Sequence, residues 1–343
     1  MTQDDIVPGT NGPSWRTVDA PEVGLVGQAW NRAVEAAETG TLFHTMEWLQ
    51  AMAQGFGRTL RAYAFLDGSG SVKALFPVVM GKVGPLRTAY SPISIVTPYG
   101  GPACAVGDFS RCLQAISRIA RDQKWDYLSI SFPPRASYEL VPPRGFSIRA
   151  GSTCLVPLGP EKSMWDALES RCRRAIGKAR SSGLTVRDVS GFDFLDDYIS
   201  WGAAAHARYH EEYPVPRAFL EALRDMVLPS GALLARGVFA KEQAVAYWFF
   251  GIWRGSLFYL DSSMDRTAGA SGAGSLVTWE TMQLASQRGA TQLDLLGTTI
   301  PAIALFKRSF GGQNAPAHGM ERSTRRYRLA RGLRNRVLRR FPR

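Results

Sequence analysis

The stretch that begins at Tyr259 carries the strongest indication of a ligand site. A strand-like segment leads into a loop rich in glycine and alanine, and a helix follows. Such a loop leaves backbone N–H groups free at a helix N-terminus, and with the helix dipole these groups suit an anion such as a phosphate. The candidate phosphate-binding residues are Arg266, Gly269, Gly272 and Gly274. A turn without a ligand explains the composition equally well, and the spacing matches neither a Walker loop nor Gly-x-Gly-x-x-Gly.

A lysine between two aromatic residues is the second candidate. The strand-like run Leu293–Gly297 ends in glycine, and the run Ile303–Gly312 presents Lys307 between Phe306 and Phe310. This order predicts a short helix whose lysine lies at the carboxyl end of the sheet, where α/β proteins usually bind ligands. A helix-end lysine that only binds backbone carbonyl groups is the alternative.

The histidines and cysteines do not indicate a metal site. His206 and His210 lie four residues apart, but no third ligand is near, and Glu211 does not complete an H-E-x-x-H pattern. A half-buried helix face explains this pair better. The four cysteines contain no Cys-x-x-Cys, so we expect buried thiols, no metal and no required cofactor. Four carboxylates could act as a general base, namely Glu280, Asp261, Asp265 and Asp294. Their spacing in the sequence does not indicate that any two of them form a pair.

Most of the positive charge lies at the end of the chain. The formal net charge of the 343 residues is +12, and ten arginines with Glu321 give the segment 321–343 a charge of +9. This concentration favours a local basic attachment site over a protein that wraps a nucleic-acid duplex. The length favours two domains.

The same segment has the pattern of a basic amphipathic helix. Leu329, Leu333, Val337 and Phe341 recur every four residues among arginines. Through Arg322–Arg343 the helix would suit an anionic membrane surface or the phosphates of a tRNA. A helix that docks on the first domain by its apolar stripe, with solvated arginines, is the third interpretation.

No segment has the pattern of a membrane span or a targeting signal. Residues 1–12 are acidic and polar. The longest apolar run, 244–253, is about half of the ~20 residues that a span requires. We expect a cytoplasmic protein, soluble or peripheral at the inner membrane face.

The expected elements occur twice in one order: two helices, three strands, a helix and a strand. The first set is Val26–Ala37, Met46–Ala53, Arg61–Leu66, Ala74–Met80, Ile93–Val96, Phe109–Ile119 and Trp125–Phe132. The second set is Phe194–Tyr209, Arg217–Met226, Ala232–Phe239, Val245–Trp253, Leu257–Asp261, Gly274–Arg288 and Thr291–Leu296. Each set ends in a strand, helix, strand unit, which we expect to be parallel within an otherwise antiparallel sheet. Between the sets, Glu161–Leu184 is expected to be one long basic helix.

Several short motifs resemble those of the FemAB-like transferases, which are tandem GNAT-fold proteins. The matches are the Leu-Phe-Lys-x-x-Phe-Gly run around Lys307, the Asp-Leu-Leu-Gly strand before it, and segments at 43–49 and 174–183. The resemblance spans 40–312 in the order of elements. It implies an α/β (α+β) protein with two GNAT-like domains, each a mixed, mostly antiparallel sheet flanked by helices. The expected boundaries are 14–150, 151–315 and a basic tail, 316–343, which packs on the first domain in one interpretation.

The resemblance also implies roles for individual residues. Lys307 matches a lysine that binds phosphate and stabilises charge in the reacting complex, and Phe306 positions it. Amine attack on an ester or thioester forms a tetrahedral oxyanion, and a buried cation would stabilise this oxyanion. Tyr259 matches a tyrosine that contacts substrate, and Tyr99 lies in the loop that lines the precursor site of the family.

One family feature is altered in this chain. The family often has an arginine and a tyrosine four residues apart in one helix, where they hold the precursor. Here Glu212 follows Arg208 at that spacing, whereas Tyr209 and Tyr213 share it. The acceptor can therefore differ from the usual muramyl peptide.

The function expected from the resemblance is acyl transfer to an amine. Family members move an aminoacyl group from charged tRNA to a cell-wall precursor, and looser relatives acylate amines, some from acyl-CoA. We expect an acyl or aminoacyl transferase that acts on an amine of a cell-envelope precursor, such as a peptidoglycan-type peptide, a polysaccharide or a lipid. The donor stays open, since Arg266 and Gly269 fit the Arg-x-x-Gly-x-Gly pattern of CoA-binding loops but Ser271 does not. A non-catalytic module that binds RNA or a membrane is the alternative class.

Overall fold

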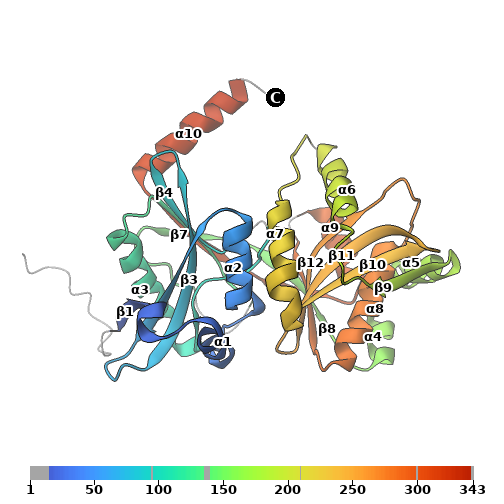
Figure 1. Cartoon of the computed structure of the whole chain (residues 1–343), viewed down its shortest axis with the longest axis horizontal. Helices are drawn as coiled ribbons and strands as arrows, with labels where there is room; N and C mark the ends of the chain where they lie inside the picture. The colour runs from blue at the N-terminus through green and yellow to red at the C-terminus, as the bar shows by residue number, and fades with distance from the viewer. Residues whose placement is uncertain (1–14, 94–95, 135–139, 209, 299, 341–343) are drawn as a thin grey trace, which may run out of the picture.

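Two sheets lie side by side along the long axis of the molecule, and helices flank both of them (Figure 1). The computed structural model describes residues 15–340 apart from 94–95, 135–139, 209 and 299. Antiparallel pairs dominate both sheets, and each sheet contains one parallel pair. The expected α/β fold with two mixed, mostly antiparallel sheets is confirmed.

The first sheet takes its strands mainly from the first half of the chain. They are β1 (Arg16–Asp19), β2 (Thr59–Leu66), β3 (Val72–Val83), β4 (Leu86–Ser91), β5 (Ala103–Cys104), β6 (Tyr127–Ser131), β7 (Phe146–Arg149) and β15 (Gly319–Ser323). Their order is β1-β2-β3-β4-β6-β15-β7, and β5 pairs with β3. The helices of this half are α1 (Gly27–Ala36), α2 (Met46–Gly55) and α3 (Phe109–Asp122). The apolar residues of α3 recur at helical spacing, so Leu113 and Ile116 are buried on one face.

The second sheet is formed by the second half of the chain. Its strands are β8 (Ser152–Pro157), β9 (Leu184–Asp188), β10 (Leu233–Ala240), β11 (Gln243–Trp253), β12 (Ser256–Met264), β13 (Gln292–Gly297) and β14 (Gln313–Pro316). Their order is β14-β8-β13-β12-β11-β10-β9. The helices here are α4 (Glu161–Ala167), α5 (Ser170–Ser181), α6 (Leu195–Ala207), α7 (Arg217–Ala222), α8 (Ala273–Gln287) and α9 (Pro301–Arg308).

The predicted repetition of elements is present in the structure. The series α1, α2, β2, β3, β4, α3, β6 corresponds to α6, α7, β10, β11, β12, α8, β13. In both series the last helix joins two parallel strands, β4 with β6 and β12 with β13. The prediction of one parallel pair in each antiparallel sheet is therefore confirmed. That each half folds as an independent domain with the expected boundaries stays a prediction.

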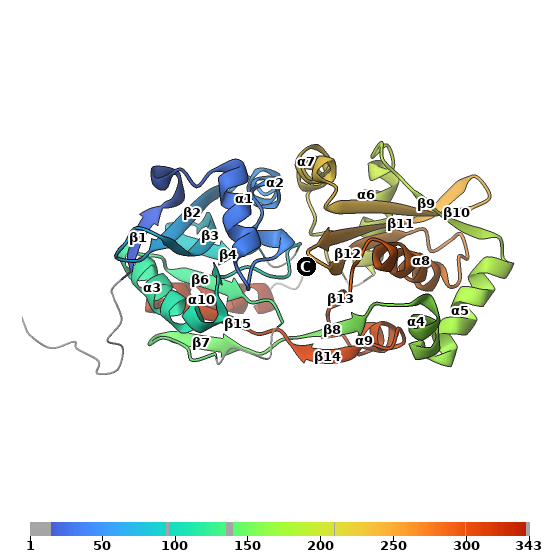
Figure 2. The ribbon, with the colours of Figure 1, turned by 90° about the horizontal axis from the view of Figure 1, so that it is seen from below.

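A two-stranded ribbon connects the sheets (Figure 2). The chain passes from β7 to β8 in one direction and from β14 back to β15 in the other. The two crossings lie against each other, since the Ala317 N–H donates to the Gly151 carbonyl at 2.9 Å. A Cβ on Gly151 would lie 2.3 Å from the Ala317 oxygen, so this close approach requires glycine.

The two halves also share a core. Phe43 of the first half packs edge-on against Phe258 of the second, with ring centroids 5.0 Å apart. Trp48 on α2 contacts Phe219 on α7 with a centroid distance of 6.2 Å. Gly55 permits this approach, because a Cβ there would lie 2.3 Å from the Phe219 Cα. The halves are thus packed together, and side chains from both can form one site.

Two predicted elements need correction, and the first is the strand Ile93–Val96. The third strand of the first set is instead β4, which pairs with β3 through a turn at Gly84 with φ +56°. Ile93 and Val96 lie in a loop, and 94–95 lie outside the described residues. The Val-Gly-Pro turn after β3 is the local signal for this hairpin.

The second correction concerns the long basic helix Glu161–Leu184. The chain forms α4 and α5 with a break between them, because Leu168 and Glu169 are extended, with ψ 139° and 149°. Leu168 is buried in the second core, and the Glu169 N–H donates to the Ser309 carbonyl at 2.9 Å. These tertiary contacts outweigh the helix propensity of the segment. Leu184 begins β9 instead.

The tail forms helix α10 (Arg325–Arg340), which projects from the first sheet (Figure 1). Leu329 and Leu333 are 69% and 63% exposed, so docking of the tail by its apolar stripe is wrong at these two positions. Phe341 lies outside the described residues. None of the helices in the described part of the chain has the length and apolar character that crossing a membrane requires.

Candidate active site

The parallel strands β12 and β13 separate soon after they meet. They pair only over Ser256–Phe258 and 292–294. Beyond that point β12 continues beside β11 as far as Met264, while the end of β13 pairs with β8 at Gly297. The strands therefore leave a gap at their carboxyl ends, where α8 and α9 begin.

Lys307 lies beside this gap, at the end of α9. Its ammonium donates to the Gly297 carbonyl at the end of β13, with Nζ 2.6 Å from the oxygen. Lys307 is only 8% exposed, and burial lowers its pKa from 10.5 to about 8, although the charge of Asp294 acts in the opposite direction. Phe306 beside it packs edge-on against the buried ring of Phe310 at a centroid distance of 5.2 Å. Lys307 thus lies at the carboxyl end of the sheet, where the sequence predicted it.

A buried carboxylate on β13 connects the two halves. Asp294 accepts a hydrogen bond from the Tyr99 hydroxyl at 2.8 Å, one from the Thr153 hydroxyl, and one from the Leu296 N–H at 2.8 Å. Burial raises the pKa of Asp294, whereas these donors and the charge of Lys307 oppose the rise. An aspartate in this state accepts a proton more readily than an exposed one.

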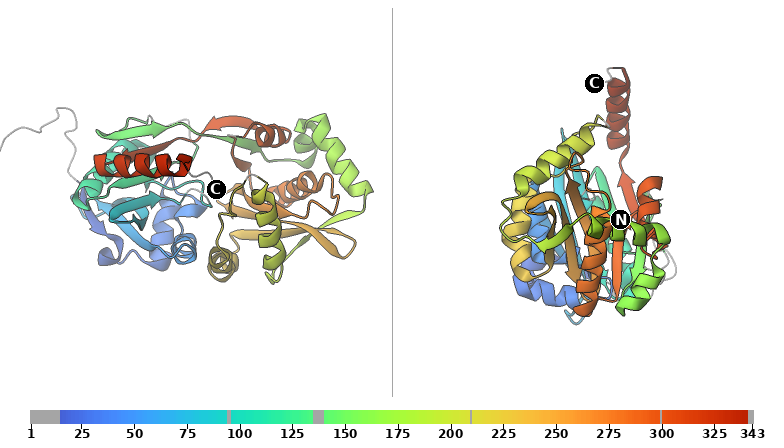
Figure 3. Two further views of the ribbon diagram at one scale, coloured as in Figure 1. Left: turned by 90° about the horizontal axis from the view of Figure 1, so that it is seen from above. Right: turned by 90° about the vertical axis from the view of Figure 1, so that its right-hand side faces the viewer.

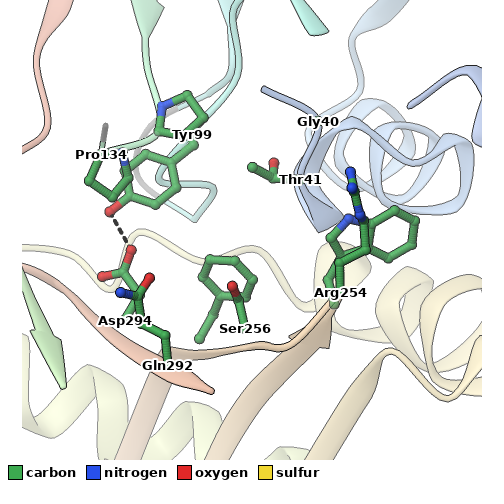
Figure 4. Close-up of a pocket in the computed structure, with 11 residues that line it drawn as sticks. Gly40, Thr41, Tyr99, Pro134, Arg254, Ser256, Gln292 and Asp294 are labelled. Atoms are coloured by element: carbon green, nitrogen blue, oxygen red, sulfur yellow. Dashed lines mark hydrogen bonds between the residues drawn. The ribbon is translucent and has the colours of Figure 1, made fainter. Parts of the chain in front are cut away.

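A cavity of about 300 Å³ lies between the two halves, and Asp294 forms part of its wall (Figure 4). The wall combines residues of both halves, including Thr41, Tyr99, Pro134, Arg254, Gln292 and Asp294. Arg254 donates to the Ala37 carbonyl at 3.1 Å. The described residues of the wall thus offer one cation and one carboxylate, and polar groups between them, to a substrate that enters between the halves.

The glycine-rich loop packs closely on α5 at the start of α8. Gly272 has φ +87°, and a Cβ there would lie 2.3 Å from the Ala175 carbonyl oxygen. Gly274 lies against Phe306 and Trp248, each 3.5 Å from an ideal Cβ. The loop therefore lies on the same side of the sheet as Phe306, whereas Arg266 and Gly269 are exposed.

Tyr259 belongs to the same side of the second sheet as this loop. The Trp248 indole N–H donates to its hydroxyl at 2.6 Å, and that hydroxyl donates to Ser262 at 3.2 Å. Tyr259 packs with Phe306 on the core between this sheet face and α8. The contact of Tyr259 with a substrate stays a prediction.

Arg208 and Tyr213, two of the predicted precursor-binding residues, follow α6, and neither lines the cavity that Asp294 lines. Tyr213 donates to Asp261 at 3.2 Å, as does Tyr198 at 2.7 Å, on the face of the sheet that packs against α6 and α7. Arg208 is exposed at the end of α6, and Tyr209 lies outside the described residues. Burial raises the pKa of both Tyr198 and Tyr213.

The structure thus brings some predicted residues together and separates others. Tyr99 donates to Asp294, and the charge of Lys307 acts on the same carboxylate, whereas Tyr213 donates to Asp261 on the neighbouring strand β12. No local pattern in the sequence pairs Asp294 with Tyr99 or gives Thr153 a role. The available signal was a lone carboxylate within the otherwise apolar run 293–296, a position where an aspartate must have partners.

The surroundings of the predicted histidine pair and of the four cysteines are those of ordinary structural residues. His206 Nδ1 lies 3.5 Å from a carboxylate oxygen of Glu211. All four cysteines are buried and free, as expected. Across the described ranges, no three His, Cys, Asp or Glu side chains are grouped so that they could hold a metal ion.

Comparisons with known proteins agree with this architecture. Residues 168–308 match the family model described as "Acetyltransferase (GNAT) domain". A search of curated protein sequences gave no match. Among solved structures, FemX is similar with a TM-score of 0.67 at 12% identity, over 86% of this chain and 95% of that one.

Two further solved structures have the same arrangement. L-PGS from Bacillus licheniformis has a TM-score of 0.58 at 12% identity, over 90% of this chain and 96% of that one. A tandem GNAT protein from the clavulanic acid biosynthesis pathway has a TM-score of 0.50 at 11% identity, over 89% and 98%. At such identities the likeness concerns the fold. Residues 168–308 therefore match a GNAT domain, and the chain as a whole has the tandem GNAT fold that its motifs predict.

Proposed function

We propose that this protein is an acyltransferase that moves an activated acyl or aminoacyl group onto an amine of a cell-envelope precursor. The observation that carries the proposal is the buried ammonium of Lys307 at the gap between β12 and β13. It lies within the residues that match the GNAT domain. A cation held at this gap in a site of low dielectric would stabilise the oxyanion formed when the amine attacks the acyl carbonyl.

The neighbouring carboxylate would serve the amine. In the reaction a C–N bond forms, the C–O or C–S bond of the donor breaks, and the attacking amine loses a proton. Asp294 lines the cavity between the halves, and burial raises its pKa, which makes it a better proton acceptor than an exposed aspartate. We assign to Asp294, held by Tyr99, the binding of the amine and the acceptance of this proton.

Two donors are compatible with the proposal. The match to a GNAT acetyltransferase domain and the loop at the start of α8 favour acyl-CoA, whose pyrophosphate would bind near Gly272 and Gly274. The likeness to FemX, with the Lys307 motif, favours aminoacyl-tRNA. The acceptor would be a peptide, polysaccharide or lipid precursor of the envelope, and the protein would act in the cytoplasm, at the inner face of the membrane.

Calorimetry and native mass spectrometry test the proposal. The purified full chain is titrated with CoA, acetyl-CoA, charged tRNA and uncharged tRNA, beside Lys307→Ala and the control Arg308→Ala. Arg308 is the exposed cation next to Lys307 on α9. We expect one donor class to bind the native chain, Arg308→Ala to retain transfer, and Lys307→Ala to lose transfer.

The possible results separate three readings of the site. Tight binding of CoA identifies an acyl-CoA transferase, and preference for charged over uncharged tRNA identifies an aminoacyl transferase. If no donor binds and no acylated product forms with any of them, the proposal is wrong and the chain is a binding module on a transferase fold.

A further inference from the structure

A hollow lined by basic residues lies where α10 leaves the first sheet. Its volume is about 450 Å³, and its wall is formed by the turn after β3, the turn after α3, β15 and the start of α10. We call it the basic hollow; its charged residues are Arg87, Lys124, Asp126, Arg322 and Arg326. Four cations therefore surround one carboxylate.

One carboxylate cannot neutralise four cations, and the oxygens of this carboxylate are already bound by groups of the fold. Asp126 is buried and accepts the Thr324 hydroxyl at 3.0 Å and the Arg87 N–H at 3.0 Å. Arg322 donates to the Trp125 carbonyl at 3.0 Å, which fixes its guanidinium at the hollow. Burial, and to a smaller extent the charge of Arg121, lower the pKa of Arg322, whereas Asp126 opposes this shift, and the four cations of the hollow are crowded around that one carboxylate. An anion such as a phosphate would relieve this crowding.

Helix α10 is fixed at its root next to the hollow. The Tyr327 ring stacks on Tyr127 with centroids 4.5 Å apart and an interplanar angle of 10°. The Thr324 hydroxyl accepts the Tyr327 N–H at 3.3 Å, which caps the first turn. The direction in which α10 leaves the body is therefore set by the packing of its root.

Beyond this root, α10 presents leucines and arginines to solvent. Leu329 and Leu333 lie four residues apart, hence on one face of the helix, and both are mostly exposed. Arg325, Arg328 and Arg331 are exposed around them. In the view from above α10 lies over the first half, clear of the second sheet, and the other view shows it standing away from the body (Figure 3).

We propose that the basic hollow and α10 together form a docking surface for a membrane rich in anionic phospholipids. The leucines insert between acyl chains, and the cations of the hollow bind phosphate groups of the lipid heads. Charge alone would suit RNA equally well, but two leucines exposed on one face of an arginine-rich helix favour a lipid surface. Attachment of this kind is independent of the transfer chemistry proposed above.

Vesicle flotation of the full chain tests the proposal. We expect binding to vesicles of phosphatidylcholine with about a third phosphatidylglycerol, little binding to pure phosphatidylcholine, and weakening by salt. Leu329→Ser with Leu333→Ser should reduce partitioning about tenfold or more, since two buried leucine side chains are lost. Arg87→Gln, Lys124→Gln and Arg326→Gln together should reduce it about 100-fold, at roughly fivefold for each cation.

Matched controls separate attachment from general changes of surface. Val26→Ser with Val72→Ser removes two exposed apolar side chains at the starts of α1 and β3. Lys162→Gln, Lys178→Gln and Lys241→Gln remove three exposed cations of the second half. Both controls should bind vesicles within about twofold of the native chain when corrected for net charge.

Three outcomes would overturn the proposal. They are equal binding to both vesicle types, loss in the lysine control as large as in the hollow variant, and binding to tRNA but not to vesicles with the same dependence on the hollow cations. If thermal unfolding shows that the triple variant is not folded, Lys124→Gln with Arg326→Gln replaces it, because both side chains are exposed. The expected reduction is then about 25-fold.

Discussion

In each half of the molecule, a hydrogen-bond donor binds the carbonyl group at the carboxyl end of the last parallel strand. The two halves use different donors. In the first half the Gly100 N–H donates to the Ser131 carbonyl at the end of β6, at 2.7 Å. In the second half the Lys307 ammonium donates to the Gly297 carbonyl at the end of β13, at 2.6 Å. The same order of elements thus ends in a neutral backbone group in one half and in a cation in the other.

This difference indicates that the two halves of the duplicated fold contribute different groups to the candidate site. In the first half the closing loop is tightly packed, since a Cβ on Gly101 would lie 2.8 Å from the ring of Phe132. The same loop sends Tyr99 across to Asp294 in the second half. The first half therefore contributes the hydroxyl that binds Asp294, while the cation to which we assign stabilisation of the oxyanion lies in the second half.

The largest expected effect comes from removing the cation. Lys307→Ala should lower the rate of acyl transfer by about 100- to 1000-fold, the usual cost of losing one group that stabilises an oxyanion. Its melting temperature should change little, because a buried ammonium is itself costly to desolvate. The rate of release of CoA or deacylated tRNA, with the donor that binds, measures the effect.

Two variants make this result specific. Lys307→Arg keeps a cation and should retain part of the activity, and Arg308→Ala should retain nearly all of it. If Lys307→Ala and Arg308→Ala lower the rate of acyl transfer equally, the cation at the end of β13 has no specific role in catalysis.

The corresponding change in the first half should affect stability instead. A Cβ on Gly100 would lie 2.6 Å from the Ser91 carbonyl carbon and 2.7 Å from its oxygen, so the loop must shift. We expect Gly100→Ala to lower the free energy of unfolding by about 2–3 kcal/mol. Gly107→Ala is the control, because no atom lies within 4 Å of its ideal Cβ. Denaturant unfolding measures both, and similar losses would contradict the prediction.

The hydroxyl that links the halves should have a smaller effect. Tyr99→Phe removes one of the donors to the buried carboxylate of Asp294, which should cost about 2 kcal/mol of stability and raise the pKa of Asp294 further. In a double-mutant cycle, Asp294→Asn should abolish most of the cost of Tyr99→Phe. Additive unfolding free energies would show that the two residues do not interact.

The sequence predicted the parts of this comparison that are local. The repeated order of elements and the parallel pair of β12 with β13 follow from apolar periodicity and turn residues, which neighbours in the chain determine, whereas β4 was missed. The position of Lys307 followed from a glycine at a strand end and a short helix after it. The structure contains these features because contacts with distant segments do not oppose them.

The contacts that distant segments make could not be read in this way. Tyr99 and Asp294 are 195 positions apart in the chain, and β15 enters the first sheet between β6 and β7 after the whole second half. The break at Leu168 depends on burial of that side chain by other elements. Each of these depends on tertiary packing, on which a local pattern carries no information.

The smallest expected effect is a pH dependence of the activity. It should come from Lys307, the cation at the end of β13. The pKa of Lys307 is about 8, against 10.5 for an exposed lysine. If the ammonium stabilises the oxyanion, activity should fall about tenfold per pH unit above pH 8. Lys307→Arg should not show this fall, because arginine stays charged throughout the range.

The same pKa predicts an opposite trend in stability. Between pH 8 and 10.5 the unfolded chain keeps the proton on Lys307 while the folded chain loses it. The unfolded state therefore binds more protons, and the free energy of unfolding rises with pH in this window. Lys307→Met should remove that rise. Activity that falls while stability rises over one pH range, with both trends absent from the variants, would assign them to this lysine. A fall in activity that persists in Lys307→Arg would assign it to another group.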